Sequence, residues 1–449
     1  MTQFAYQQDS NSKKEPSTQP LHSYVPLPPK QCVILAAGEG TRMRPLTGSR
    51  PKVMIPIKNR PMLEHLLCSV RDSGIHEFII VVGYQEHAIR DHFKDGKEFG
   101  VTIQYARQAL QAGTADALLT AKPHVHGSFL MVNGDMLLSD QDIKKIWQSP
   151  APTLGICPVS DPSKYGVVTV EEHRDSTTPS LYVTSFEEKS KNSSSSLINC
   201  GVYHFNPDIF EQLSHIIPSP RGELELVDAL IPAISSQTLR AVYMENWRDL
   251  GSPWDLLDAN ASLLEHALTK EEKNNGCDQN IAQGAIIEEG VWLHGTIIIG
   301  SGTIIKSGTY IEGPCIIGNN VKIGPHTYIR GATAIGDNCH IGHSTEIKNS
   351  IVFPNTNLPH FNYIGDTVIG SGCNFGAGTI VANLRHDKSS IKVGKIDTGR
   401  KKFGAVIGDN VLFGINCSVN VGSRIGNNCA FAPGSRIQGD IGDKSMYRE

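Results

Sequence analysis

The segment "LAAGEGTRMRPLTGSRPK", residues 35–52, combines glycines and cations at a spacing that suits phosphate binding. Gly38 and Gly40 let backbone N–H groups approach an anion closely. Arg42 supplies a forked cation and Lys52 a compact point charge. For the glycines alone, a structural turn without a ligand is the alternative interpretation. The four residues together predict a cradle for a triphosphate.

A second group that could do chemistry is Asn133-Gly134-Asp135, which follows the apolar run 129–132. A carboxylate at the end of a buried strand can hold a hard divalent cation against phosphate oxygens. Asn-Gly is also a common hairpin turn, which is the alternative for this triplet by itself. With the glycine-rich segment a hundred residues earlier, we favour metal binding and predict Mg²⁺ at Asp135.

The elements around these residues follow the order of an α/β domain. The apolar run 32–37 breaks into glycine, the leucines between 63 and 70 have helical spacing, and the run 78–82 indicates another buried strand. With the strand expected at 129–132, this order predicts a doubly wound α/β domain. Its ligand should lie beyond the carboxyl ends of the strands, where the glycines and Asp135 fall.

The second half of the chain has a six-residue period. Apolar residues occupy every sixth position from Ile287 to Ile347, and the period resumes as Ile369, Phe375 and Val381 and again from Ile407 to Ile437. Such hexapeptides are typical of a left-handed parallel β-helix with about 18 residues per coil. The twenty repeat positions predict nearly seven coils.

The period is interrupted between Ile347 and Ile369, which are 22 residues apart. We expect extra residues here to leave the wall of the β-helix as a loop that carries His360. A histidine, with an ordinary pKa of about 6.5, is suited to act as a general base. A surface histidine without function is the alternative.

A longer insertion, between Val381 and Ile407, contains a basic run that could meet anionic groups or simply be solvated.

Composition excludes several classes of protein. The net charge of −4 gives no reason to expect nucleic acid as a partner, and no apolar run approaches the roughly 18 residues of a membrane span. Ten cysteines without a C-x-x-C pair fit neither a disulfide framework nor a zinc site. Without a signal peptide, the chain is expected to be cytoplasmic and to bind small molecules.

The string at 35–52 resembles the signature of the sugar-1-phosphate nucleotidylyltransferases. The resemblance implies that Arg42 and Lys52 neutralise charge developing on the α-phosphorus, with Asp249 in "NWRDLGSPWD" as the second magnesium ligand. It implies a pyrimidine nucleotide, UTP or dTTP, and leaves the choice open. The implied nucleotide contacts are Gly38, Gly40, Thr41, Gln108, Gly113 and Thr114. The implied sugar-phosphate contacts are Gly166, Glu187, Glu188, Lys189 and Asn199, with the role of each glutamate undecided.

The string "HFNYIGD" resembles the acetyltransferase half of the bifunctional N-acetylglucosamine-1-phosphate uridylyltransferase and glucosamine-1-phosphate N-acetyltransferase family. This resemblance implies that His360 removes a proton from a sugar amine, which then attacks the thioester of acetyl-CoA. It also implies that the protein forms a homotrimer. The implied substrate and acetyl-CoA contacts are Arg330, Lys348, Tyr363, Asn374 and Asn383. The string "GAGTIVANLRHD" is closer to archaeal members, so galactosamine 1-phosphate is a second possible substrate.

Together these observations favour a bifunctional enzyme that acetylates an amino-sugar 1-phosphate and couples it to a nucleotide. Two alternatives are a nucleotidylyltransferase with a structural β-helix and a non-catalytic regulatory subunit of the same plan. The expected division is a disordered tail at 1–29, a nucleotidyltransferase domain at 30–255, a linker helix at 256–283 and a β-helix domain at 284–449. The helix should stop at Asn274-Asn275-Gly276.

Overall fold

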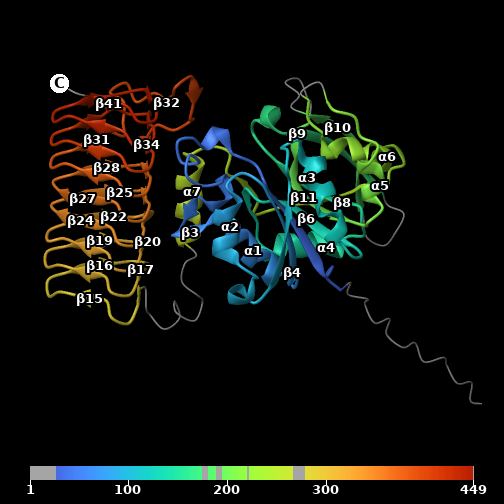
Figure 1. The fold of residues 1–449 in the computed structure, drawn as a ribbon, viewed down its shortest axis with the longest axis horizontal. Coiled ribbons are helices and arrows are strands. Elements are labelled where there is room, and N and C mark those ends of the chain that lie inside the picture. Colours follow the sequence, from blue (N-terminus) through green and yellow to red (C-terminus); the bar gives the residue numbers. More distant parts are fainter. Residues whose placement is uncertain (1–26, 174–179, 189–194, 220–221, 266–278, 448–449) are drawn as a thin grey trace, which may run out of the picture.

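The computed structural model describes residues 27–173, 180–188, 195–219, 222–265 and 279–447. Nearly all of the predicted tail, Lys189 and the predicted end of the linker helix lie outside these residues. Two folded parts lie side by side, an α/β domain and a β-helix (Figure 1). No helix within the described ranges has the length and apolar character needed to cross a membrane.

The α/β domain is built on one nine-stranded mixed sheet. In spatial order its strands are β5 (Thr102–Arg107), β4 (Glu77–Val82), β1 (Gln31–Ala36), β6 (Phe129–Asn133), β11 (Leu197–Phe205), β8 (Thr153–Pro158), β12 (Arg240–Tyr243), β10 (Ser180–Glu188) and β9 (Gly166–His173). Strands β5, β4, β1 and β6 are parallel, so their carboxyl ends share one edge. The predicted strands at 32–37, 78–82 and 129–132 are therefore β1, β4 and β6.

Helices cover both faces of this sheet, which confirms the doubly wound α/β fold. They are α1 (Met62–Asp72), α2 (Glu86–Phe93), α3 (Thr114–Ala121), α4 (Asp140–Gln148), α5 (Ile209–Leu213) and α6 (Ile231–Ser235). Leu63 and Ile143, on α1 and α4, pack into the core on one face, whereas Leu118 and Phe210, on α3 and α5, pack into the core on the other. The apolar strands are buried on both sides, as a parallel sheet requires.

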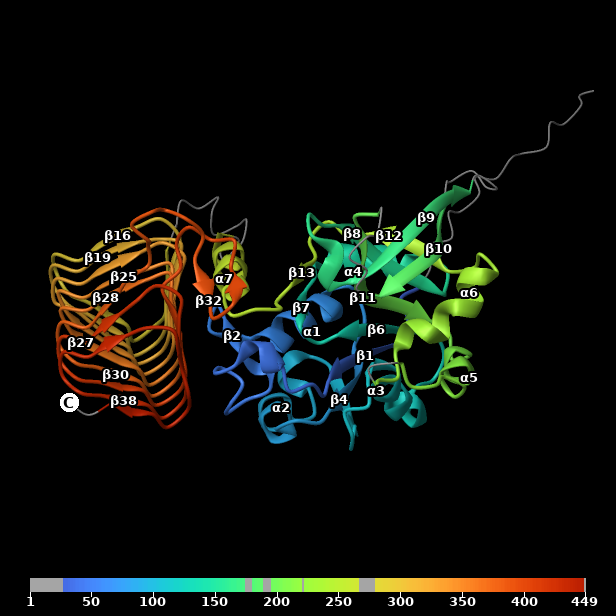
Figure 2. The ribbon, with the colours of Figure 1, turned by 90° about the horizontal axis from the view of Figure 1, so that it is seen from above.

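Short elements at the edge of the sheet carry the candidate residues. The 3₁₀ turns η1 (Thr41–Met43) and η2 (Lys52–Met54) follow β1, and the short hairpin of β2 (Pro56–Ile57) and β3 (Arg60–Pro61) comes next. Strand β7 (Met136–Leu137) follows β6 and pairs with β13 (Arg248–Asp249), which places Asp249 opposite Met136. Helix α7 (Asp255–Glu265) then lies between the two parts of the molecule (Figure 2).

The second part is a parallel β-helix with three faces, as predicted. The first face contains β14 (Gln279–Ile281), β17 (Ile297–Ile299), β20 (Cys315–Ile317), β23 (Thr333–Ile335), β26 (Ile351–Val352), β29 (Val368–Ile369), β34 (Ala405–Ile407), β37 (Ser423–Ile425) and β40 (Asp440–Ile441). The second contains β15 (Ile286–Ile287), β18 (Ile304–Ile305), β21 (Lys322–Ile323), β24 (His340–His343), β27 (Asn357–His360), β30 (Asn374–Phe375), β35 (Leu412–Phe413), β38 (Ala430–Phe431) and β41 (Met446–Tyr447). The third contains β16 (Trp292–His294), β19 (Tyr310–Glu312), β22 (Tyr328–Arg330), β25 (Glu346–Lys348), β28 (Tyr363–Gly365), β31 (Ile380–Val381), β36 (Ser418–Val419) and β39 (Arg436–Ile437).

The prediction of a loop at His360 was wrong. Strand β27 stays in the wall, and Leu358 pairs with Ile341 just as Ile364 pairs with Ile347. Two corners, from Ile347 to Val352 and from Ile364 to Ile369, span five residues instead of six, so two shortened corners cause the change of register. The count of nearly seven coils was also too low, because the buried residues Val352, Leu358 and Ile364 continue the core through this region.

The insertion after Val381 forms a hairpin, β32 (Lys392–Val393) and β33 (Ile396–Asp397), outside the coils. Its buried residues Ile391, Val393 and Phe403 join a hydrophobic cluster with α7 of the α/β domain. The rings of Phe403 and Trp254 meet edge to face at 6.1 Å. The insertion therefore contributes to the packing between the two parts.

Candidate active sites

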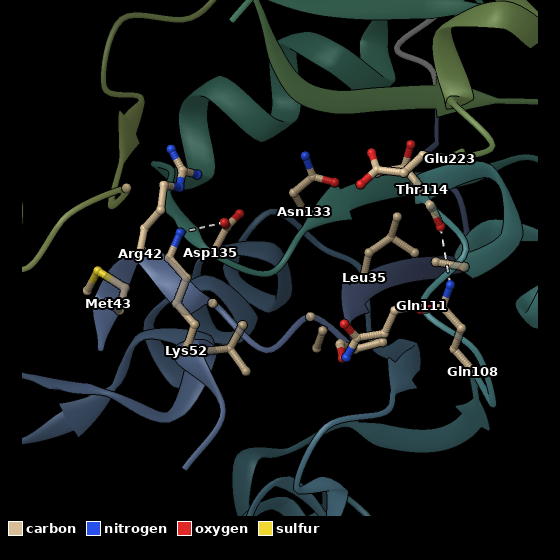
Figure 3. Close-up of a pocket in the computed structure, with 18 residues that line it drawn as sticks. Leu35, Arg42, Met43, Lys52, Gln108, Gln111, Thr114, Asn133, Asp135 and Glu223 are labelled. Atoms are coloured by element: carbon tan, nitrogen blue, oxygen red, sulfur yellow. Dashed lines mark hydrogen bonds and ion pairs between the residues drawn. The ribbon is translucent and has the colours of Figure 1, made fainter. Parts of the chain in front are cut away.

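A cavity of about 370 Å³ opens at the carboxyl ends of β1 and β6 (Figure 3). It brings together most of the residues predicted to bind the nucleotide. Those that line it are Gly38, Gly40, Arg42, Lys52, Gln108, Gly113, Thr114 and Asp135. Thr41 begins η1 but does not line the cavity. Gln111 and Glu223 also line it and were missed by the sequence analysis, which had no charge pattern or motif to single them out.

Lys52 is the buried cation of this cavity. It is 6% exposed, and its Nζ lies 2.6 Å from the Asp135 carboxylate. Burial opposes ionisation of Asp135, but the Lys52 ammonium outweighs it and holds the pKa of Asp135 below its ordinary value. Gly40 has φ of 70°, and a Cβ there would lie 2.5 Å from the Lys52 Cβ. Only glycine therefore lets the two ends of the glycine loop, residues 38–52, pack together.

Gln108 lies at the opposite side of the cavity and is 6% exposed. Its side-chain amide donates hydrogen bonds to the Gly113 carbonyl at 3.2 Å and to the Asp116 carboxylate at 2.8 Å. Thr114 Oγ1 accepts a hydrogen bond from the backbone N–H of Leu226 at 3.0 Å. These bonds fix the turn that begins α3, so Gln108 supports this edge of the cavity.

A second cavity of about 220 Å³ adjoins the first and shares Arg42, Thr114 and Asp135 with it. Of the predicted sugar-phosphate residues, those that line it are Gly166, Glu188 and Asn199. Glu187 does not line it, since neighbouring residues of β10 point to opposite sides. The structure thus favours Glu188 over Glu187, and Lys189 is outside the described residues.

The two aspartates predicted to bind metal meet at this shared edge. Asp249 and Asp135 both line the second cavity, because β13 pairs with the strand that follows Asp135. Burial and the charge of Asp135 together raise the pKa of Asp249. Tyr165, another residue that the sequence analysis missed, donates a hydrogen bond to Asp249 at 3.1 Å. Tyr165 lies in the quoted string "KYGVV", one position before Gly166.

A divalent cation fits this pair of carboxylates. Two carboxylates forced together are unfavourable until a cation compensates their charge, and oxygen ligands suit Mg²⁺. Within the described residues, no group of three or more His, Cys, Asp or Glu side chains is arranged to hold a metal ion. The protein would therefore supply two ligands and leave other positions for water and phosphate oxygens.

In the β-helix, four of the predicted acetyltransferase residues gather near one corner. Arg330 on β22 and Lys348 on β25 are register neighbours, and Lys348 is followed in the next coil by Gly365 of β28. Arg330 pairs with Glu346 at 3.1 Å. Burial raises the pKa of Tyr363, which lies beside Asn383. This group presents two cations and two polar side chains, as a sugar phosphate would require.

Asp366 organises this corner and was not among the predicted site residues. It is 3% exposed and accepts hydrogen bonds from Asn349 at 2.7 Å and Asn383 at 2.5 Å. The Lys348 ammonium lies 3.8 Å from its carboxylate. Burial lowers the pKa of Lys348, with a further contribution from nearby Lys402. Asp366 ends the string "HFNYIGD", so the motif itself contained the signal.

His360 and Asn374 lie apart from that corner, on the second face of the β-helix. Both are exposed, and His360 pairs in register with His343 of the preceding coil. The His360 backbone N–H donates to the Asn362 side chain at 3.4 Å. The six predicted residues of the β-helix therefore form two groups, one with the cations and one with the histidine.

Comparisons with protein families agree with the two-part architecture. The family model described as nucleotidyl transferase matches residues 31–266. The model described as the GMPPB C-terminal domain matches residues 311–396, and that of the hexapeptide repeat of succinyl-transferase matches residues 404–434. The first match covers more than half of the chain and includes both cavities.

Individual relatives are similar over almost the whole chain. The "Bifunctional protein GlmU" of Methanococcus aeolicus is 37% identical over 423 residues, covering 93% of this chain and 97% of that protein. The "Bifunctional sugar-1-phosphate nucleotidylyltransferase/acetyltransferase" of Sulfurisphaera tokodaii is 35% identical, covering 92% and 99%. The "UTP--glucose-1-phosphate uridylyltransferase AglF" of Haloferax volcanii is 34% identical and matches 54% of this chain.

Proposed function

The chain belongs to the family of bifunctional sugar-1-phosphate nucleotidylyltransferases and acetyltransferases. On this premise we propose that it acetylates glucosamine 1-phosphate with acetyl-CoA, with galactosamine 1-phosphate as a second substrate. It then couples the product to UTP, giving UDP-N-acetylhexosamine and pyrophosphate. The observation that carries the proposal is the convergence of Arg42, Lys52, Asp135 and Asp249 on two joined cavities.

In the nucleotidyl transfer, a phosphate oxygen of the sugar 1-phosphate attacks the α-phosphorus of the triphosphate, and pyrophosphate leaves. No protein nucleophile is required, so the protein aligns the reactants and neutralises charge. The triphosphate lies in the first cavity against Arg42 and Lys52, and the sugar lies in the second beside Glu188 and Asn199. A magnesium ion held by Asp135 and Asp249 would supply further neutralisation of phosphate charge.

In the acetyl transfer, His360 accepts a proton from the sugar ammonium, and the freed nitrogen attacks the thioester carbonyl of acetyl-CoA. The C–N bond forms and the C–S bond breaks. The second proton lost from the nitrogen goes to the leaving sulfur, so CoA leaves as a thiol while His360 keeps the first proton. Arg330 and Lys348 bind the sugar phosphate, and Tyr363, Asn374 and Asn383 position the sugar and the acetyl group.

We propose a homotrimer as the working assembly. Exposed apolar side chains on the second and third faces support it, among them Ile286 at 55%, Trp292 at 62% and Leu412 at 52% exposed. Light scattering should then report three chain masses, and a monomer at micromolar concentration would contradict the proposal. We also propose a cytoplasmic location and the domain boundaries given above, except that β14 (Gln279–Ile281) belongs to the β-helix, because it pairs with β17.

One experiment tests both reactions. The protein is incubated with glucosamine 1-phosphate, acetyl-CoA, UTP and Mg²⁺, and free thiol and pyrophosphate are followed separately. Both should be released, with pyrophosphate depending on prior acetylation. Parallel assays with galactosamine 1-phosphate and with dTTP determine the sugar and base preference. Release of thiol alone or of pyrophosphate alone would show that the protein catalyses only one of the two reactions. Release of neither would support a regulatory subunit.

A further inference from the structure

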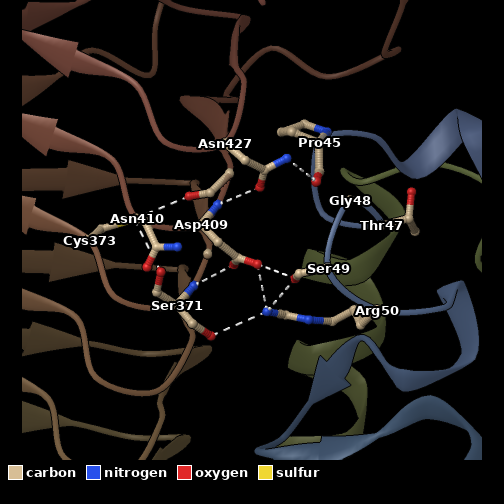
Figure 4. Close-up of polar contacts among 12 residues, drawn as sticks. Pro45, Thr47, Gly48, Ser49, Arg50, Ser371, Cys373, Asp409, Asn410 and Asn427 are labelled. Atoms are coloured by element: carbon tan, nitrogen blue, oxygen red, sulfur yellow. Dashed lines mark hydrogen bonds and ion pairs between the residues drawn. The ribbon is translucent and has the colours of Figure 1, made fainter. Parts of the chain in front are cut away.

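The tip of the glycine loop lies against the β-helix (Figure 4). Asp409, in the turn after β34, accepts hydrogen bonds from the Ser49 hydroxyl and from Arg50 Nη2, the latter at 2.8 Å. One coil further on, the Asn427 side-chain amide donates to the Pro45 carbonyl at 3.1 Å. A Cβ at Gly48 would lie 2.6 Å from the same amide nitrogen, so the approach is close.

The contact between Arg50 and Asp409 is largely shielded from water. The side chain of Asp409 is 7% exposed and that of Arg50 is 17% exposed. The guanidinium carbon lies 5.0 Å from the centre of the Phe353 ring, and Ser371 Oγ accepts a further hydrogen bond at 3.4 Å. Removing one partner of a buried ion pair leaves the other charge without compensation, so separating the two partners is unfavourable. The pair therefore fixes the position of Arg50 against the β-helix.

Asp409 has two separable roles. Its Oδ1 accepts the backbone N–H of Ser371 at 2.7 Å, as part of a column of Asn and Asp side chains along the turns of the β-helix. In the same column the Asn319 side chain accepts a hydrogen bond from the Ser301 backbone N–H at 2.9 Å. The Asp337 carboxylate accepts one from the Asn319 backbone N–H at 2.7 Å. An asparagine at position 409 can therefore still make the hydrogen bond of the column. The second carboxylate oxygen of Asp409, Oδ2, is the one that contacts the glycine loop.

The base of the same loop carries the cations of the nucleotide cavity. Only Pro51 separates Arg50 from Lys52, and Lys52 packs against Gly40. The Thr47 hydroxyl donates to the Gly40 carbonyl at 3.2 Å and ties the tip to the base. The α/β domain contributes Tyr84, which donates to the Thr47 carbonyl at 3.1 Å. The loop is thus held from both domains at once.

We propose that Asp409 of the β-helix is a positioning residue for nucleotidyl transfer, acting through Ser49 and Arg50 on the placement of Lys52 and Arg42. The inference rests on the proposed nucleotidyl transfer. The β-helix would then have a second function besides acetyl transfer, because one of its coils determines the positions of Lys52 and Arg42 in the α/β domain. Misplacement of such groups by about 1 Å can cost about 100-fold in rate.

The test compares Asp409→Asn with the matched variant Asp337→Asn, which removes one charge from the same column. In full-length protein, Asp409→Asn should lower kcat/KM for UTP about 10-fold or more. The KM for the N-acetylated sugar 1-phosphate and the rate of thiol release should change less than about twofold. Asp337→Asn should leave all of these values unchanged. An equal loss of both reactions, or equal behaviour of the two variants, would overturn the proposal.

A double variant and a readout other than activity complete the test. Because Asp409 acts through Arg50, adding Arg50→Met to Asp409→Asn should cause little further loss. Amide hydrogen exchange of residues 41–54 should be faster in Asp409→Asn than in the unchanged protein, while that of β1 should not change. If the unchanged protein releases no pyrophosphate, the proposed function fails, and unchanged exchange in the variant would separately overturn the role of Asp409.

Discussion

At the scale of single residues, Lys52 is the most constrained group of the nucleotide cavity. It is almost fully buried and paired with Asp135. Lys52→Met keeps much of the length and apolar packing of the side chain but removes the charge. We expect it to lower kcat for pyrophosphate release about 100-fold or more, since charge developing on the phosphates loses a preorganised partner.

The matched control for Lys52 is Lys58→Met, a change in a nearby lysine that does not line either cavity. It should leave pyrophosphate release unchanged, and thiol release should survive in both variants. If Lys52→Met and Lys58→Met have equal kcat, the proposed role of Lys52 is wrong.

His360 gives a second prediction at this scale. His360→Ala should abolish thiol release and spare pyrophosphate release from a pre-acetylated sugar 1-phosphate, because the general base is lost while the distant cavities are untouched. The control is His343→Ala, in the register neighbour of the preceding coil. A folded His360→Ala variant that loses both reactions, or that retains thiol release, would contradict the assignment.

Which site residues could be predicted depends on how close they lie in the sequence. Arg42 and Lys52 belong to one continuous string, and that string was enough to select them. The pairing of Lys52 with Asp135 joins residues 83 positions apart, in segments that follow the neighbouring strands β1 and β6, and only the fold reveals it. Asp366 is an exception, because it lies within the quoted string "HFNYIGD" and was still not selected; its role is evident only from the hydrogen bonds that Asn349 and Asn383 donate to it.

At the scale of elements, helix α7 contains a titratable group with a testable effect. Asp255 begins the helix and accepts a hydrogen bond from the Ser252 backbone N–H at 2.7 Å. Burial raises the pKa of Asp255 to about 6. Because the folded state then binds this proton more tightly than the unfolded chain does, the stability that Asp255 contributes is complete below about pH 4 and lost as the pH rises through 6.

Asp255→Asn should remove this dependence while keeping an acceptor for Ser252. The apparent melting temperature of the variant should match that of the unchanged protein near pH 4 and exceed it at pH 7.5, by an amount equivalent to about 3 kcal/mol. Differential scanning calorimetry across this range provides the measurement. A variant that is less stable at pH 7.5 would show that the ionised carboxylate is favourable in α7.

The β-helix shows why some elements were easier to predict than others. A six-residue period follows directly from the inward side chains, so the fold could be predicted from the isoleucines alone. A corner shortened by one residue changes the numbering of every later coil, and by counting it cannot be distinguished from an inserted loop. The burial of Leu358 and Ile364 settles the matter, since both fill the core that a loop would have left.

At the scale of the whole molecule, the two domains share a continuous contact. Asn260 of α7 donates to the Ala332 carbonyl at 3.0 Å, and Asn59 donates to the Ile335 carbonyl at 2.7 Å. Arg400 of the insertion pairs with Asp258 of α7 at 2.7 Å. The bonds to Ala332 and Ile335 and the contact between Arg50 and Asp409 lie along the first face of the β-helix, whereas Arg400 extends the interface through the insertion. None of them could be predicted from sequence, because each partner is an ordinary polar residue of its own domain.

The last prediction concerns the energy of this interface. Ala334 points outward from the first face but is fully buried, because the α/β domain covers it. Ile298 occupies the same column two coils earlier and is only half-buried. Ala334→Asp would bury an unpaired charge between the domains, which costs several kcal/mol, whereas Ile298→Asp leaves its charge near water.

We therefore expect Ala334→Asp to lower the apparent melting temperature of the α/β domain and to reduce pyrophosphate release while thiol release persists. Ile298→Asp should have little effect on either reaction. Calorimetry and the two assays distinguish the cases. If Ala334→Asp and Ile298→Asp behave alike, the contact between the domains contributes little to stability, and the glycine loop would have to be held by the α/β domain alone.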